Sequence, residues 1–61
     1  MKIGDKVEIV YTDIFDPRVK IGDTASIVDF HTTGEIEIVM ETGERKGAYQ
    51  VCQKWDIKLI R

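Results

Sequence analysis

The chain has 61 residues, enough for one domain only. Its 9 Lys and Arg and 11 Asp and Glu residues give a net charge of −2, which argues against a dedicated DNA- or RNA-binding domain, because such domains are usually clearly basic. The single cysteine, Cys52, excludes an internal disulfide, and together with His31 it supplies too few ligands for a zinc site built from His and Cys.

The amino-terminal residues carry no apolar leader, and the apolar runs are far too short to span a membrane. A lone thiol fits a reducing compartment. We therefore expect a cytoplasmic protein without a membrane partner. A domain this small buries only about 60% of its unfolded surface, so we expect its stability to depend on tight packing or on self-association.

Apolar residues at every second position predict short strands. A long loop containing Asp16-Pro17 follows the first strand, because Pro17 fixes its own φ and keeps Asp16 out of the helical region. Gly22-Asp23 leads into the second strand, and Thr32-Thr33-Gly34 predicts the turn before the third. The predicted strands cover residues 6–11, 24–28, 35–40 and 57–60.

Thr42-Gly43 predicts the next turn, which is either a two-residue turn or a bulged one, so the register of the last hairpin stays open. Residues 50–54 are interpreted as a single 3₁₀ turn before the final strand. This layout predicts an all-β fold, a small five-stranded SH3-like barrel formed by residues 1–61 as one domain. Closure into a barrel would also remove the exposed strand edges.

Several short segments, most of them rich in turn residues, carry a resemblance to a known family. They are Ile3-Gly4-Asp5-Lys6-Val7, Asp16-Pro17, Ile21-Gly22-Asp23-Thr24-Ala25, Gly34-Glu35-Ile36, Glu41-Thr42-Gly43 and Asp56. The chain resembles a family of small SH3-like or KOW-like domains found in phages and the bacteria that carry them. It departs from that family at Ala25, where Gly is usual, and at Met40-Glu41, where an aromatic residue usually precedes the acid. No activity is attached to the family, so the resemblance implies a phage or mobile-element origin and no functional residues.

No residue set carries a clear catalytic or metal-binding pattern. Asp13, Asp16 and Asp23 flank the first loop and could bind a hard cation, but their spacing is not that of a calcium-binding EF-hand loop, and two of them belong to ordinary turn dipeptides. His31 and Cys52 could form a nucleophile pair only with a third, orienting group, and the sequence offers none. We therefore expect no catalytic residue, no cofactor, no metal and no enzymatic activity.

The aromatic residues allow two interpretations. Tyr11, Phe15, Pro17 and Trp55 could line a groove for proline-rich peptides. The opening segment lacks the aromatic motif of such domains, and Trp55 comes directly before the last strand. We therefore expect Tyr11 and Trp55 to plug the ends of the barrel instead.

The charges are unevenly distributed. Residues 29–44 hold five acids and no Lys or Arg, whereas residues 45–61 hold five bases and one acid. Two oppositely charged faces could steer a partner. The interpretation we favour is that the two segments form one hairpin and pair their charges across it.

The feature most indicative of function is a set of apolar residues that alternate out of phase with the predicted core. A contiguous exposed apolar patch marks an interface. The leading hypothesis is a non-enzymatic protein-interaction module that docks this face, rimmed by Glu35 and Glu37, onto itself or onto a host protein; a host-defence inhibitor would be one instance. Phe30 alone has a second interpretation, as part of the core edge. The outward set is Val10, Val28, Phe30, Val39 and Ile60.

Two alternatives remain open. A nucleic-acid-associated, KOW-like barrel would use the basic carboxy-terminal residues Lys54, Lys58 and Arg61. A ligand site or active site that forms only at a homo-oligomer interface is the other. Light scattering separates the second from the rest, because a strict monomer excludes it.

Overall fold

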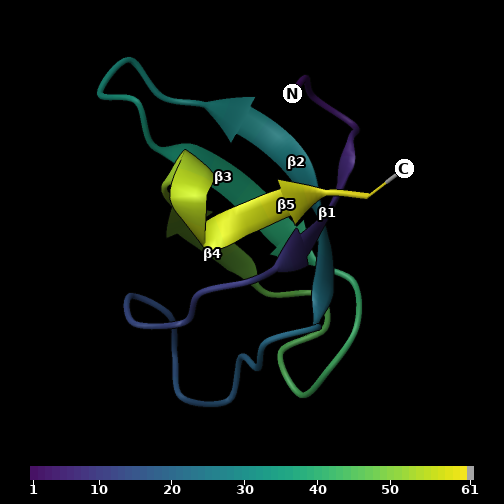
Figure 1. The fold of residues 1–61 in the computed structure, drawn as a ribbon. Coiled ribbons are helices and arrows are strands. Elements are labelled where there is room, and N and C mark those ends of the chain that lie inside the picture. The colour runs from purple at the N-terminus through teal and green to yellow at the C-terminus, as the bar shows by residue number, and fades with distance from the viewer. Residues whose placement is uncertain (61) are drawn as a thin grey trace.

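A computed structural model describes residues 1–60 and has an all-β architecture (Figure 1). The strands form one antiparallel sheet in the order β4-β3-β2-β1-β5, so the prediction of an all-β fold with five strands is confirmed. Each strand pairs with its neighbour in sequence except β5, which returns to pair with β1. The elements are β1 (Lys6–Ile9), β2 (Thr24–Phe30), β3 (Ile36–Met40), β4 (Tyr49–Cys52), the 3₁₀ turn η1 (Lys54–Asp56) and β5 (Ile57–Leu59).

One hydrophobic core lies on the inner face of the sheet. Every strand contributes to it, which explains the period-two pattern, since alternate residues of a strand point to the same face. Burying a side chain of the size of Val or Ile stabilises the fold by about 1.5–3 kcal/mol. The strand residues of the core are Val7, Ile9, Ala25, Ile27, Ile36, Ile38, Met40, Cys52 and Ile57.

The long first loop, predicted from Asp16-Pro17, covers residues 10–23 and closes on itself. Ile9 and Gly22–Asp23 exchange backbone hydrogen bonds at its base, at 2.8 and 2.9 Å. Phe15 and Val19 from this loop are buried in the core. The interpretation of Phe15 as part of an exposed aromatic groove is therefore wrong, because the loop folds back over one end of the sheet.

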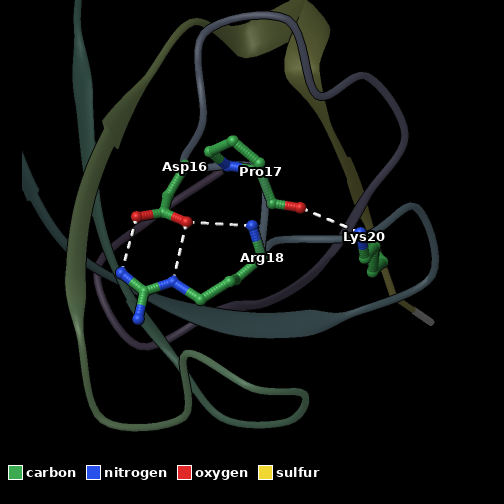
Figure 2. A network of polar contacts seen from close by, with 4 residues as sticks. All are labelled: Asp16, Pro17, Arg18 and Lys20. Carbon is green, nitrogen blue, oxygen red and sulfur yellow. Dashed lines mark hydrogen bonds and ion pairs between the residues drawn. The ribbon is translucent and has the colours of Figure 1, made fainter.

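The tip of this loop is fixed by a local network (Figure 2). The guanidinium of Arg18 turns back and donates to both carboxylate oxygens of Asp16, at 3.0 and 2.9 Å, while the Arg18 backbone N–H donates to the same carboxylate at 2.9 Å. Lys20 Nζ donates to the Pro17 carbonyl oxygen at 2.9 Å. Pro17, held between these contacts, starts the turn that brings Val19 into the core.

The connection between β3 and β4 is longer than a tight turn and covers residues 41–48. Its base is closed where Met40 N–H donates to the Ala48 carbonyl oxygen at 2.9 Å and Gly47 N–H donates to the Met40 carbonyl oxygen at 2.7 Å. Gly43 has the positive φ expected of it, +85°, and lies against the side chain of Asp23 from the first loop. The register left open by the sequence therefore pairs Val39 with Tyr49.

The 3₁₀ turn begins later than predicted. Gln50 and Cys52 pair with Ile38 and Ile36, so they belong to β4 rather than to a turn. The turn is held instead by the Gln53 backbone N–H, which donates to the buried Asp56 carboxylate at 2.8 Å, and by the Asp56 N–H, which donates to the Gln53 carbonyl oxygen at 3.0 Å.

A bulge interrupts β2 between Ile27 and Asp29. One extra residue on a strand reverses the alternation beyond it. Phe30 consequently lies opposite the buried Ile36 and shares its face, whereas Asp29 lies opposite Glu37. Phe30 is therefore at the rim of the core face, 41% exposed, and not on the outer face with Val28 and Val39.

Within residues 1–60 no helix is long and apolar enough to cross a membrane.

Candidate interaction surface

One row of side chains crosses the outer face of the sheet from edge to edge. The β-sheet register places Lys6 beside Ser26, Ser26 beside Val39 and Val39 beside Tyr49. Ile60 extends the row on the other side, where its N–H donates to the Lys6 carbonyl oxygen at 3.0 Å. Residues next to one another in such a row contact directly, so the row shows where outer side chains are continuous.

The apolar part of this face lies over β2, β3 and β4. Tyr49 is 64% exposed and Val51 is 43% exposed, and both point outward from β4. Val39 on β3 lies opposite Tyr49, and Val28 lies on β2, the strand beyond β3; both side chains are half-buried. We call Val28, Val39, Tyr49 and Val51 the outer patch.

Polar contacts bound the outer patch towards β1. Lys6 Nζ donates to Ser26 Oγ at 2.8 Å and to Glu41 Oε2 at 2.6 Å. The hydrogen bond from Lys6 lowers the pKa of the Glu41 carboxyl. This network lies between Val39 and Ile60 and separates them.

The predicted interface residues therefore lie in several places. Val28 and Val39 belong to the outer patch, and Glu37 borders it because it lies directly opposite Val51. Glu35 is half-buried in the turn before β3, where Thr33 Oγ1 donates to its carboxylate at 3.2 Å.

Val10 and Ile60 are exposed beyond the ends of the paired strands β1 and β5.

The sequence did not lead us to predict Tyr49 and Val51 as surface residues of the outer patch. The alternation of Tyr49 and Val51 with Gln50 and Cys52 was the available signal.

A mixed group of side chains lies at the end of β2 and β3. Donor atoms of Asp29, His31 and Glu37 lie within 4.8 Å of one another, and His31 Nε2 is 3.2 Å from Glu37 Oε1. Sequence reasoning missed this group because the bulge, which places Asp29 opposite Glu37, is not visible in the alternation. Carboxylate oxygens and an imidazole nitrogen are ligands that bind divalent cations, although such exposed groups are also common without an ion.

The three carboxylates of the first loop are bonded separately. Asp13 accepts a hydrogen bond from the Tyr11 hydroxyl at 2.7 Å, Asp16 binds Arg18, and Asp23 accepts one from the Lys20 backbone N–H at 2.9 Å. The bond to Asp13 raises the pKa of the Tyr11 hydroxyl. Each of the three carboxylates therefore stabilises its own local segment of the loop, and the three do not share a partner.

Cys52 and His31 face different surroundings. Cys52 is buried in the core, and this burial, with the Asp56 charge nearby, raises the pKa of its thiol to about 12. His31 is exposed and lies against Glu37. The thiol is consequently protonated at neutral pH, whereas nucleophilic catalysis uses the thiolate.

Tyr11 and Trp55 do not plug the ends of the sheet. They are 48% and 64% exposed. Trp55 projects from η1, and the Asp56 carbonyl oxygen in the same turn accepts hydrogen bonds from the backbone N–H groups of Val10 and Tyr11, at 2.9 and 3.3 Å. The two aromatic residues therefore come from chain segments joined by these bonds. Residues 1–60 form no pocket.

The acidic and basic segments do not pair across β3 and β4. In the part of the chain that the structure describes, the ion pairs are Lys6–Glu41, Arg18–Asp16 and His31–Glu37. The expectation of a charge-paired hairpin is wrong, because the residue opposite Glu37 is Val51.

The basic residues proposed for nucleic-acid binding lie near the carboxy-terminal end. Lys54 and Lys58 are exposed, and Lys58 lies opposite Glu8 of β1. Arg61 lies outside the described residues. Lys54 stands beside the exposed Trp55 on η1.

Comparisons with protein-family models, with curated proteins and with solved structures give no match for this chain.

Proposed function

We propose that this chain is a non-enzymatic protein-interaction module that acts by docking its outer patch onto another protein in the cytoplasm. The observation that carries the proposal is the exposed Tyr49 lying directly opposite Val39 on the outer face of the sheet, with Val51 beside them. Tyrosine is enriched at protein interfaces, since it offers a large apolar ring together with a hydroxyl that bonds at the rim. Glu37 gives the patch an acidic border.

The architecture we propose for the module is an SH3-like barrel. The return of β5 to β1, the long first loop and the 3₁₀ turn before β5 support it. A core shared by all five strands also supports it. The resemblance to small phage domains adds the proposal that the partner is a protein of a bacterial host.

The test replaces outer-patch residues by a charged residue. Val39→Lys and Val28→Lys are expected to weaken partner binding at least tenfold, because burying an unpaired ammonium at an interface is costly. Thr33→Lys is the matched control, because Thr33 is exposed in the turn between β2 and β3. Native mass and the set of captured proteins are measured for each variant. Unchanged mass and unchanged partners in both patch variants would exclude this face.

A second function is favoured by one observation, the exposed Trp55 next to Lys54 on η1. An aromatic ring beside a lysine can stack on a base while the ammonium contacts a phosphate. Retention on single-stranded DNA or RNA at low salt, lost in Lys54→Glu/Lys58→Glu, would support a nucleic-acid-binding function. No retention at low salt would eliminate it.

A further inference from the structure

The outer edge of β4 carries unpaired backbone groups. Residues of an antiparallel pair alternate between exchanging hydrogen bonds with the neighbouring strand and pointing away from it. Met40 N–H donates to the Ala48 carbonyl oxygen, which fixes this alternation along β3 and β4. Gln50 and Cys52 therefore bond to β3, whereas the N–H and C=O groups of Tyr49 and Val51 point away from the sheet.

These four groups have no partner among residues 1–60. Within these residues, the backbone N–H groups of Tyr49 and Val51 donate no hydrogen bond, and their carbonyl oxygens accept none. β5 does not cover them, because it pairs with β1 at the opposite edge of the sheet. An extended backbone is the ligand that such an edge accepts.

The side chains of the same two residues add a second requirement. Tyr49 and Val51 are exposed on the outer face, two positions apart. A strand added alongside β4 places its own alternate side chains next to them. The added strand is therefore expected to carry apolar residues at alternate positions.

The charges beside β4 favour an acidic foreign strand. Lys46 precedes β4 and Lys54 follows it, both are exposed, and neither belongs to an ion pair within residues 1–60. In a two-fold pairing of β4 with itself centred on Gln50, Lys46 of one copy approaches Lys54 of the other, and like charges repel. A strand with an acidic residue at each end is instead complementary.

We propose that the edge of β4 binds an extended segment of a partner protein, with alternating apolar residues and an acidic residue at each end. This inference deepens the proposed function, because it names the partner chemistry next to the outer patch. Two backbone hydrogen bonds would form with Tyr49 and two with Val51. Lys46 and Lys54 would contact the flanking carboxylates.

The test uses a capped synthetic peptide, Glu-Glu-Val-Thr-Val-Thr-Glu-Glu, and the whole protein. Binding is followed by NMR, and the amides of Tyr49 and Val51 are expected to shift and to exchange with solvent more slowly. The same peptide with Lys in place of Glu is expected to bind at least tenfold more weakly. Equal binding of the two peptides, or shifts confined to other strands, would overturn the proposal.

Two N-methylated peptides test the backbone contact itself. One is methylated at the Val residues and the other at the Thr residues, so that only one of them loses the N–H groups that face β4. That peptide is expected to lose binding while the other retains it. Equal binding of both would show that the peptide is not added as a strand.

Variants of the protein complete the test. Val51→Pro removes an N–H that β3 does not use, so the fold is retained while peptide binding is lost. Lys46→Glu/Lys54→Glu weakens binding by roughly threefold or more for each residue. Lys2→Glu/Lys58→Glu makes the same change in net charge, with Lys58 on β5 at the opposite edge of the sheet, and leaves peptide binding unchanged. An equal loss in both double variants would overturn the contact with Lys46 and Lys54.

The outcomes separate this inference from the proposed function. Val39→Lys alters the outer patch but leaves the edge groups of Tyr49 and Val51 in place. Peptide binding that survives in Val39→Lys, with no effect of that variant on protein partners, supports the edge and excludes the patch. A protein dimer with slow exchange at Tyr49 and Val51, and no peptide binding, would overturn the inference, because the occupant would then be a second copy.

Discussion

At the scale of single residues, Asp16 and Arg18 show how a local sequence fixes the tip of the first loop. Asp16-Pro17 predicts a turn, and the turn is present. The pairing of Asp16 with Arg18 two residues later was not predicted, because it depends on the rotamer by which the guanidinium folds back (Figure 2). Hydrogen bonds from the Arg18 side chain, and then from its backbone N–H, hold the pKa of the Asp16 carboxyl well below its usual value.

This geometry predicts a graded response to substitution. In Arg18→Gln the pKa of Asp16 rises only part of the way to its ordinary value, because the backbone N–H of residue 18 still donates to the carboxylate. NMR titration of the side-chain carboxyl carbon measures this shift. A return to the ordinary value, about 3.9, would show that the backbone bond contributes nothing.

The sign of the stability effect follows from the same shift. The pKa of Asp16 is lower in the folded chain than in the unfolded chain, so the folded state favours the ionised carboxylate. Its contribution is fully present above the unfolded pKa and is lost as the pH falls through the folded pKa. The stability difference between the wild type and Asp16→Asn is therefore expected to be constant near neutral pH and to shrink below about pH 4.

At the scale of elements, the sequence predicts strands well where one face is buried. Residues 24–28 and 35–40 alternate cleanly because Ala25, Ile27, Ile36 and Ile38 enter one core. β4 was not located because residues 50–54 were interpreted as a 3₁₀ turn, although Tyr49 and Val51 alternate with Gln50 and Cys52. Of the outer patch, only Val28 on β2 and Val39 on β3 were therefore predicted.

The bulge in β2 could not be predicted from the alternation. Val28 and Asp29 together oppose a single residue of β3, and this choice depends on how β2 pairs with β3. For this reason the sequence left two interpretations of Phe30 open, one on the outer face and one at the edge of the core. The open edge of β4 is equally a property of the assembled sheet, since it follows from β5 pairing with β1.

The connection between β3 and β4 gives a prediction at this scale. Gly43→Ala and Gly34→Ala both place a side chain at a positive φ, near +85° and +93°. This costs roughly 1–2 kcal/mol in each variant. A Cβ at Gly34 meets open space, whereas one at Gly43 collides with the Asp23 carboxylate.

Gly43→Ala is therefore expected to be the more destabilising of the two, and Gly34→Ala is its matched control. Urea unfolding of both variants measures the difference. Equal losses of stability would mean that the first loop moves away without cost, and that its contact with Gly43 does not hold the two connections together.

At the scale of the whole molecule, stability and the proposed binding depend on the two opposite faces of the same sheet. The inner face holds a single core, to which the first loop contributes Phe15 and Val19. The outer face carries the outer patch and the polar Lys6 network. Because strand side chains alternate, outward residues can be changed without removing core atoms, whereas inward ones cannot.

Ile38 tests this division. It is fully buried at the centre of β3, between β2 and β4. Ile38→Ala is expected to cost about 2–5 kcal/mol and Ile38→Val about 0.5–1.5 kcal/mol. A chain of 61 residues has a total stability of roughly 3–9 kcal/mol, so Ile38→Ala is expected to remove a large part of it.

Val39→Ala on the opposite face of the same strand is the matched comparison, since Val39 is half-buried and alternates with Ile38. It removes fewer buried atoms, so thermal unfolding is expected to shift far less than in Ile38→Ala. Partner binding is expected to weaken in Val39→Ala and to persist in Ile38→Val. The reverse pattern would place the binding determinant in the integrity of the core instead of on the outer face.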